Sequence, residues 1–474
     1  MEFGSILFVL AIIFGFYMAW SIGANDVANA MGTSVGSKAL TIKRAVILAA
    51  IMEFSGAFFV GSHVSETVQK GIVSPEIFSS NPVFFVYGML AALLSAAIWL
   101  QVASYFGWPV STTHSIVGSI IGFGILIGGV DAIHWQKVGS IVGSWVISPV
   151  LSGTIAFVIF SILRKQIYYN ADPVSAAKRI TPFLVFLVFF VMTLVLVFKG
   201  LKNLHLDLPL GSALLIAAAV GIIASIISFF LVKRIKETPE PDRVRLFQPV
   251  SVADNIKKAS RFLQAAKLDS SGDINEMLSK LLSDLKAIRS RVRTGVTIER
   301  GSTEYRTVER IFVYLQIMSA AFVAFAHGAN DVANAVGPLS AVINVLINGS
   351  ITTQSAVPTW VLMLGGVGIV VGLATWGWRV IETIGKKITE LTPTRGFSAE
   401  FGAAITIVFA SKLGLPISTT HALVGAILGV GLARGIGALN MRSIRDIILS
   451  WIITIPVGAL GAILFFYILK SIFY

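Results

Sequence analysis

The chain has 474 residues, of which 55% are hydrophobic and only 13% are charged. This composition excludes an ordinary soluble globular protein and indicates a helical membrane protein, since several apolar stretches reach the roughly 20 residues that cross a bilayer. The absence of cysteine excludes disulfide and thiol chemistry. The net charge of +13 does not indicate nucleic-acid binding, because most basic residues flank apolar segments, as the positive-inside rule expects.

Apolar segments fall into two groups around a polar stretch at 233–306. The first group lies near 5–37, 45–62, 83–105, 109–130, 138–163, 183–198 and 209–232, and the second near 311–347, 359–380, 399–413, 415–433 and 447–469. They predict an all-α polytopic membrane protein with about twelve hydrophobic helices, some of them broken helices or half-helices. The segments on either side of each "STTH" hydroxyl run form either a re-entrant hairpin or a full spanning pair.

Three motifs recur in the same order and at nearly the same offset. The sequence "GANDVANA" begins at Gly23 and again 305 positions later. "GWPVSTTHSIVGSIIGFG", from Gly107, returns 307 positions later as "GLPISTTHALVGAILGVG", and "SWVISPV", from Ser144, is echoed as "SWIITIPV". We therefore predict two homologous halves, which divide the chain into a first transmembrane repeat (1–165), additional transmembrane helices (166–232), a soluble insertion (233–306) and a second transmembrane repeat (307–474).

Basic residues predict that the two halves face opposite sides of the membrane. Lys38, Lys43 and Arg44 follow the first GAND motif, whereas Arg306 and Arg310 precede the second. Counting basic loops as cytoplasmic gives an inverted-topology repeat, which is typical of secondary transporters. The N-terminus is then outside and the 233–306 insertion is cytoplasmic, in a multi-pass protein of the cell membrane. Within the insertion, the 4-3-4-3-4 spacing of apolar residues from Ile274 to Val292 predicts an amphipathic helix. The sequence does not decide whether the protein forms a homodimer.

The GAND motifs place acidic and amide side chains inside apolar sequence. We expect Asp26 and Asp331 near the bilayer midplane, where a charged side chain costs a few kcal/mol. Gly23 and Gly328 favour a helix break just before each motif. Carboxylate and amide oxygens suit Na⁺ or another hard cation, and we assign Asp26, Asn29, Asp331 and Asn334 to the cation site. We assign Asn25 and Asn330 of the same motifs to the phosphate site. The alternative is that they only hydrogen-bond neighbouring helices.

A proline followed by hydroxyl residues marks the second motif. Such a run predicts a helix N-terminus, where free N–H groups and the positive end of the helix dipole favour an anion. These hydroxyl residues are Ser111, Thr112, Thr113, Ser418, Thr419 and Thr420. Ordinary capping without a ligand is the alternative. His114 and His421 follow the hydroxyl runs, and we expect them to be packing residues.

Three more polar residues stand within apolar sequence. Glu53 and Glu400 have no acidic counterpart in the other half, and we assign Glu53 to a cation or proton pathway and include Glu400 among the candidate cation ligands. Gln101 precedes the first hydroxyl turn and adds a candidate donor to the anion site.

At these residues the chain resembles the inorganic phosphate transporter family (PiT), over both membrane halves. The resemblance implies symport of inorganic phosphate, driven by Na⁺ in many members and by H⁺ in some bacterial ones. The family's acidic and hydroxyl residues then match the two sets named above, with phosphate at the hydroxyl turns and Na⁺ at the aspartates. Neither motif contains Lys or Arg, so an anion beside acidic groups requires co-bound cations.

We therefore predict an Na⁺-driven phosphate importer in which the halves rock around a central site. We expect no cofactor beyond Na⁺ as coupling ion. A proton-coupled or metal-phosphate symporter, a sulfate transporter and an anion channel stay open. An enzyme is not expected, because the sequence shows no Ser/His/Asp constellation or nucleotide-binding loop.

Overall fold

The computed structural model describes residues 4–62, 72–79, 81–197, 208–235, 250–291, 303–351, 357–381, 390–413, 417–435 and 439–473. Its main helices are α1 (Gly4–Gly36), α2 (Ile42–Val60), α4 (Pro82–Tyr105), α5 (Thr112–Gly128), α6 (Trp135–Leu163), α7 (Pro173–Val195), α8 (Leu210–Lys233), α9 (Val250–Leu268), α10 (Asp273–Arg291), α11 (Thr303–Asn348), α12 (Thr359–Thr375), α14 (Pro393–Lys412), α15 (Thr419–Arg434) and α16 (Met441–Phe473). Short helical turns occupy Pro75–Phe78, Val130–Ala132 and Arg164–Tyr168.

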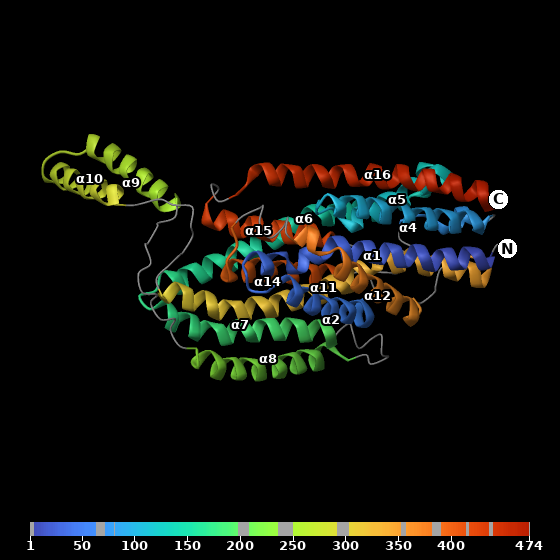
Figure 1. Ribbon diagram of the computed structural model, residues 1–474, viewed down its shortest axis with the longest axis horizontal. Helices are drawn as coiled ribbons and strands as arrows, with labels where there is room; N and C mark the ends of the chain where they lie inside the picture. Colours follow the sequence, from blue (N-terminus) through green and yellow to red (C-terminus); the bar gives the residue numbers. More distant parts are fainter. Residues whose placement is uncertain are drawn as a thin grey trace.

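Twelve of these helices correspond to the twelve apolar segments, and within the described ranges seven are long and apolar enough to cross a membrane. The helices run side by side in one elongated bundle, and the two chain termini lie at the same end of it (Figure 1). The predicted all-α polytopic class is therefore confirmed. Its inverted topology and the four proposed chain divisions stay predictions.

Helices α1 and α11 form the centre of the bundle, and both run unbroken through the GAND motifs. The prediction of a helix break at Gly23 and Gly328 is therefore wrong. A Cβ atom on Gly23 would lie 2.0 Å from the carbonyl oxygen of Ile369, and one on Gly328 would lie 2.1 Å from that of Glu53. These glycines allow two helix backbones to touch, which is the other common use of glycine in membrane helices.

Helices α5 and α15 start next to each other and run in opposite directions, α5 along α16 and α15 along α6. Helix α15 runs parallel to α6: a Cβ atom on Gly425 would touch the carbonyl oxygen of Pro149, and further along Arg164 donates to the carbonyl oxygen of Ala433. Helix α5 instead ends a few residues before α6 begins. Their 17 and 16 residues are too short to cross a bilayer comfortably, which fits the expected half-helices.

The insertion forms a hairpin of α9 and α10 that projects from one end of the bundle (Figure 1). Helix α10 confirms the predicted amphipathic helix, although Val292 lies outside the described residues. Helices α7 and α8 pack against each other, and α7 packs on α11. They form a separate layer beside the repeated helices.

Candidate functional site

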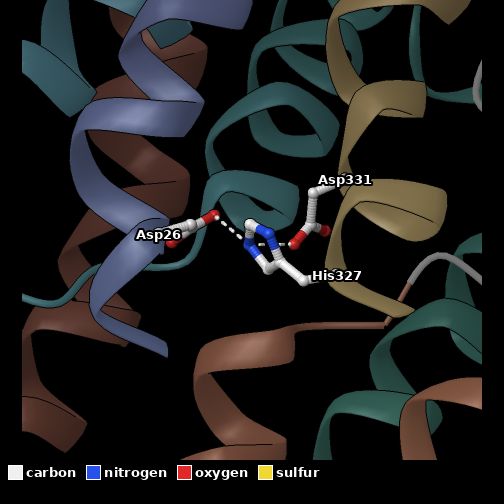
Figure 2. Close-up of side chains that lie close together, drawn as sticks. All are labelled: Asp26, His327 and Asp331. Atoms are coloured by element: carbon white, nitrogen blue, oxygen red, sulfur yellow. Dashed lines mark ion pairs between the residues drawn. The ribbon is translucent and has the colours of Figure 1, made fainter. Parts of the chain in front are cut away.

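His327 lies between the two repeated aspartates (Figure 2). Its Nε2 atom is 2.9 Å from Oδ2 of Asp331, one turn further along α11, and 3.7 Å from Oδ2 of Asp26 on α1. The three side chains are fully buried, and one ligand atom from each lies within 4.8 Å of the others. The two GAND motifs therefore meet in one site that has the spacing of a metal centre.

Sequence analysis missed His327. A signal was present, because His327 stands four residues before Asp331 and so shares its helical face. The corresponding residue in the first motif is Ile22, so the repeat comparison did not draw attention to it.

Glu53 of α2 extends this cluster on the other side of His327. Its Oε1 atom is 3.4 Å from Nδ1 of His327, and the carboxylate is fully buried. Equivalent close helix contacts place Glu53 opposite the second GAND motif and Ile369 opposite the first. Of these two helix contacts between the halves, one thus has a Glu–His pair where the other has Ile369 and Ile22, which makes the charge of the centre asymmetric.

The asparagines connect each GAND motif with the hydroxyl turn of the other half. The amide nitrogen of Asn29 donates to Oγ1 of Thr420 at 2.8 Å and to Oδ1 of Asp26 at 3.0 Å. The amide nitrogen of Asn334 lies 3.2 Å from Oγ1 of Thr113, to which it donates. These crossed contacts bring the motifs of both halves into a single centre.

The two hydroxyl turns face each other at this centre. All six of their hydroxyl residues are buried: Ser111, Thr112, Thr113, Ser418, Thr419 and Thr420. Ser111 and Ser418 are the N-caps of α5 and α15, and each accepts the backbone N–H of the third residue onward, as predicted. Thr113 and Thr420 each donate to a backbone carbonyl oxygen just before the opposite turn, at 2.9 and 3.3 Å. The paired helix starts therefore lie against each other.

Behind these turns, two histidines and two tryptophans pack reciprocally. Nδ1 of His114 lies 3.3 Å from the carbonyl oxygen of Trp451, while its ring packs on Trp145. Nδ1 of His421 lies 3.0 Å from the carbonyl oxygen of Trp145, while its ring stacks on Trp451. The expected packing role of both histidines agrees with these contacts, which hold α5, α6, α15 and α16 together.

Glu400 occupies a separate polar pocket rather than the aspartate cluster. Its carboxylate accepts hydrogen bonds from Thr33, Ser34, Gln316 and Ser319, with the Ser34 and Gln316 bonds at 2.7 and 3.2 Å. The donors come from α1 and α11, one to two turns beyond the first GAND motif on α1. The pocket therefore ties α14 to the two helices that carry the aspartates.

The structure does not bring Gln101 to the hydroxyl turns. Its carboxamide oxygen accepts a hydrogen bond from Tyr17 of α1, and the described contacts link it to no hydroxyl residue of either turn. The amide nitrogen of Asn25 donates to Oγ of Ser104, near the end of α4, at 3.0 Å. Asn330 is buried in α11.

Several oxygen atoms at the centre accept no hydrogen bond from the described residues. They are Oδ1 of Asn25, Asn29, Asn334 and Asp331, Oδ2 of Asp26, and both carboxylate oxygens of Glu53. Their side chains are at most 2% exposed. Buried acceptors without a donor are costly, and clustered carboxylate and amide oxygens are the ligands that hard cations prefer. The centre is chemically suited to cations.

A helical membrane bundle with buried carboxylates beside paired helix starts is typical of a membrane transporter. The chain belongs to the phosphate transporter family, whose model matches residues 22–462. The resemblance drawn from the GAND and hydroxyl motifs is thereby confirmed.

Known relatives match nearly the whole chain. A protein of Chlamydia pneumoniae named as a phosphate permease is 46% identical over 99% of each chain. The chloroplastic inorganic phosphate transporter 2-1 of Arabidopsis thaliana is 44% identical over 97% of this chain and 72% of its own. A solved structure of a sodium-dependent phosphate transporter is 37% identical, has a TM-score of 0.80, and is matched over 98% of this chain and 100% of its own.

Proposed function

We propose that the protein imports inorganic phosphate by symport with Na⁺, and that its two halves alternate access to the central site. Na⁺ binds at Asp26 and Asp331, and phosphate binds between the two hydroxyl turns. The family match and the resemblance to a sodium-dependent phosphate transporter support this proposal. The protein then acts in the cell membrane, with its N-terminus outside and its insertion in the cytoplasm.

The observation that carries the cation assignment is the charge of the buried centre. Asp26, Asp331 and Glu53 share His327 as their ion-pair partner among the described residues. Even a protonated His327 neutralises one of three carboxylates, and uncompensated buried charge is strongly unfavourable. Bound Na⁺ supplies the missing positive charge and uses the acceptor oxygens that lack donors.

Phosphate binding follows from the donors at the same centre. The N–H groups of Thr112, Thr113, Thr419 and Thr420 belong to the first turns of α5 and α15, where intrahelical partners are lacking. Phosphate oxygens accept such donors, and neighbouring cations balance the phosphate charge in a site of low dielectric constant. Because the motifs contain no Lys or Arg, the anion and the cations stabilise each other, which couples their binding.

A proton-coupled symporter is the second candidate, since a buried histidine between carboxylates is a typical proton-carrying arrangement. Replacing external Na⁺ with choline at constant pH separates the two candidates. Uptake that stops in choline supports Na⁺ coupling, and uptake that continues supports proton coupling.

Thr113→Val tests the phosphate assignment. The substitution keeps the side-chain shape but removes a hydroxyl that accepts from Asn334 and donates across to the opposite turn. We expect phosphate affinity to fall by about ten-fold, the value of one net hydrogen bond, with a smaller change in Na⁺ affinity. Half-saturation concentrations from liposome uptake measure both.

The matched control for this substitution is Thr154→Val, because Thr154 is exposed and, among the described residues, its hydroxyl donates to Val150 within α6. It should leave both affinities unchanged. Unchanged phosphate affinity in Thr113→Val would count against the anion site.

A further inference from the structure

Helices α7, α8 and α11 enclose an apolar groove of about 700 Å³ on the side of the bundle. Helix α8 lies outermost in the bundle, α7 lies beside it, and α11 lies on the inner side of α7 (Figure 1). The walls are almost entirely aliphatic and aromatic, and include Val185, Phe189, Ile223, Leu315 and Met318. All three helices are candidate membrane spans, so we expect lipid to have access to the groove.

The groove has a definite direction along the helices. Thr181 of α7, Ile235 just after α8, and Ile311 of α11 line one part of it. Phe189 and Met318, each about two turns further along its helix, line the other part. Helix α8 runs antiparallel to α7 and α11 here, so its C-terminus lies at the Thr181 end. We call this end, lined by Thr181, Ile235 and Ile311, the mouth of the groove.

Basic residues stand within three sequence positions of these lining residues on all three helices. Lys178 and Arg179 precede Thr181, Lys233 and Arg234 precede Ile235, and Arg310 precedes Ile311. Four of the five are exposed, and Lys178 is half-buried.

The acidic residue that precedes Arg310 points elsewhere. The carboxylate of Glu309 accepts hydrogen bonds from Tyr168 and Thr394. The mouth thus combines a cluster of positive charge with an apolar groove that leads away from it into the membrane.

We propose that this groove binds an anionic phospholipid, with an acyl chain between the helices and the phosphate headgroup at the basic mouth. An acyl chain gains little free energy when it moves from the bilayer into an apolar groove, because the surrounding lipid tails are equally apolar. The selectivity therefore comes from the headgroup, and basic pockets between transmembrane helices are known to recognise anionic lipids. Free inorganic phosphate has no part that fits the long apolar section.

The site gives the additional helices α7 and α8 a role of their own. They hold a lipid against α11, the helix that carries His327 and Asp331, so the lipid composition of the membrane acts on the transport helix. This inference depends on the fold and the charge distribution, and it holds whether Na⁺ or H⁺ drives transport.

Native mass spectrometry of the full chain in detergent tests the proposal. Phosphatidylglycerol and phosphatidylcholine with identical acyl chains are titrated against the wild type and three variants. The mouth variant combines Lys233→Gln, Arg234→Gln and Arg310→Gln, and the groove variant is Ala224→Phe, which fills the lining. The control combines Lys257→Gln, Lys258→Gln and Arg261→Gln, which removes the same charge from exposed positions of the α9–α10 hairpin.

We expect the wild type and the control to bind phosphatidylglycerol at least about ten-fold more tightly than phosphatidylcholine. The mouth variant should lose this preference, and the groove variant should bind less of both lipids. Unaltered phosphatidylglycerol binding in the mouth and groove variants would overturn the proposal. Displacement of the lipid by inorganic phosphate, or a second copy of the chain covering the groove in a lipid-independent dimer, would overturn it as well.

Discussion

Asp26→Asn and Asp331→Asn should each abolish Na⁺-dependent phosphate uptake while the protein still folds. Each substitution removes one negative charge and leaves an amide of the same shape beside His327, so the attraction for a cation falls. We expect at least about a hundred-fold loss of uptake, because about 3 kcal/mol or more of electrostatic stabilisation of the cation disappears from a buried site. Radiolabelled phosphate uptake into proteoliposomes measures it.

Asp284→Asn is the matched control, since Asp284 lies exposed on the α9–α10 hairpin far from the site in sequence. Its uptake should equal that of the wild type. Size-exclusion and thermal-unfolding profiles establish that the two aspartate variants are folded. Wild-type uptake in either folded variant would show that the buried aspartates do not hold the coupling cation.

Gly328→Ala should destabilise the protein far more than an ordinary glycine-to-alanine change. The new Cβ atom would meet the carbonyl oxygen of Glu53 at 2.1 Å, and backbone atoms of a packed helix cannot move aside locally. Overpacking of this kind costs about 1–3 kcal/mol or more, because α2 and α11 must separate. The variant should therefore unfold at lower temperature in detergent and lose uptake, since Glu53 and His327 are displaced together.

Gly139→Ala is the control for this packing argument. Gly139 lies in α6 with no neighbouring atom within 4 Å of an added Cβ, so the variant should be neutral or more stable by up to about 1 kcal/mol. Equal unfolding temperatures for Gly328→Ala and the wild type would contradict the close helix contact.

Hydropathy predicted the existence of the helices well and their limits less well. Twelve apolar segments became twelve helices, because about 20 apolar residues in a bilayer have few alternatives to helix. Helix α7 begins ten residues before the apolar segment that predicted it. Its first turns contain Lys178 and Arg179, which lower the hydropathy, whereas the start is set by the Asp172 cap and Pro173.

The site was predicted in its residue types but not in its arrangement. Repetition identified both GAND motifs and both hydroxyl turns, and the structure brings them together at one centre. The sequence repetition gave no indication that Asn29 contacts Thr420 or that Asn334 contacts Thr113, because such contacts depend on how helices from opposite halves pack. His327 was the hardest residue to predict, since its counterpart in the first motif is Ile22 and no repeat marks it. Its partner Glu53 was identified without a repeat, because a carboxylate stands out in apolar sequence.

The prediction of a helix break at Gly23 and Gly328 was wrong for a related physical reason. A glycine before a polar cluster has two uses in a membrane helix, conformational freedom and close approach, and a single sequence does not distinguish them. Gly23 and Gly328 serve the second use, so the aspartates project from continuous helices.

Phosphate uptake by purified protein in liposomes, driven separately by an imposed inward Na⁺ gradient and an imposed inward H⁺ gradient, tests the central claim most directly. The account predicts concentrative uptake with the Na⁺ gradient and little uptake with the H⁺ gradient alone. Equal phosphate accumulation when choline replaces Na⁺ would contradict it.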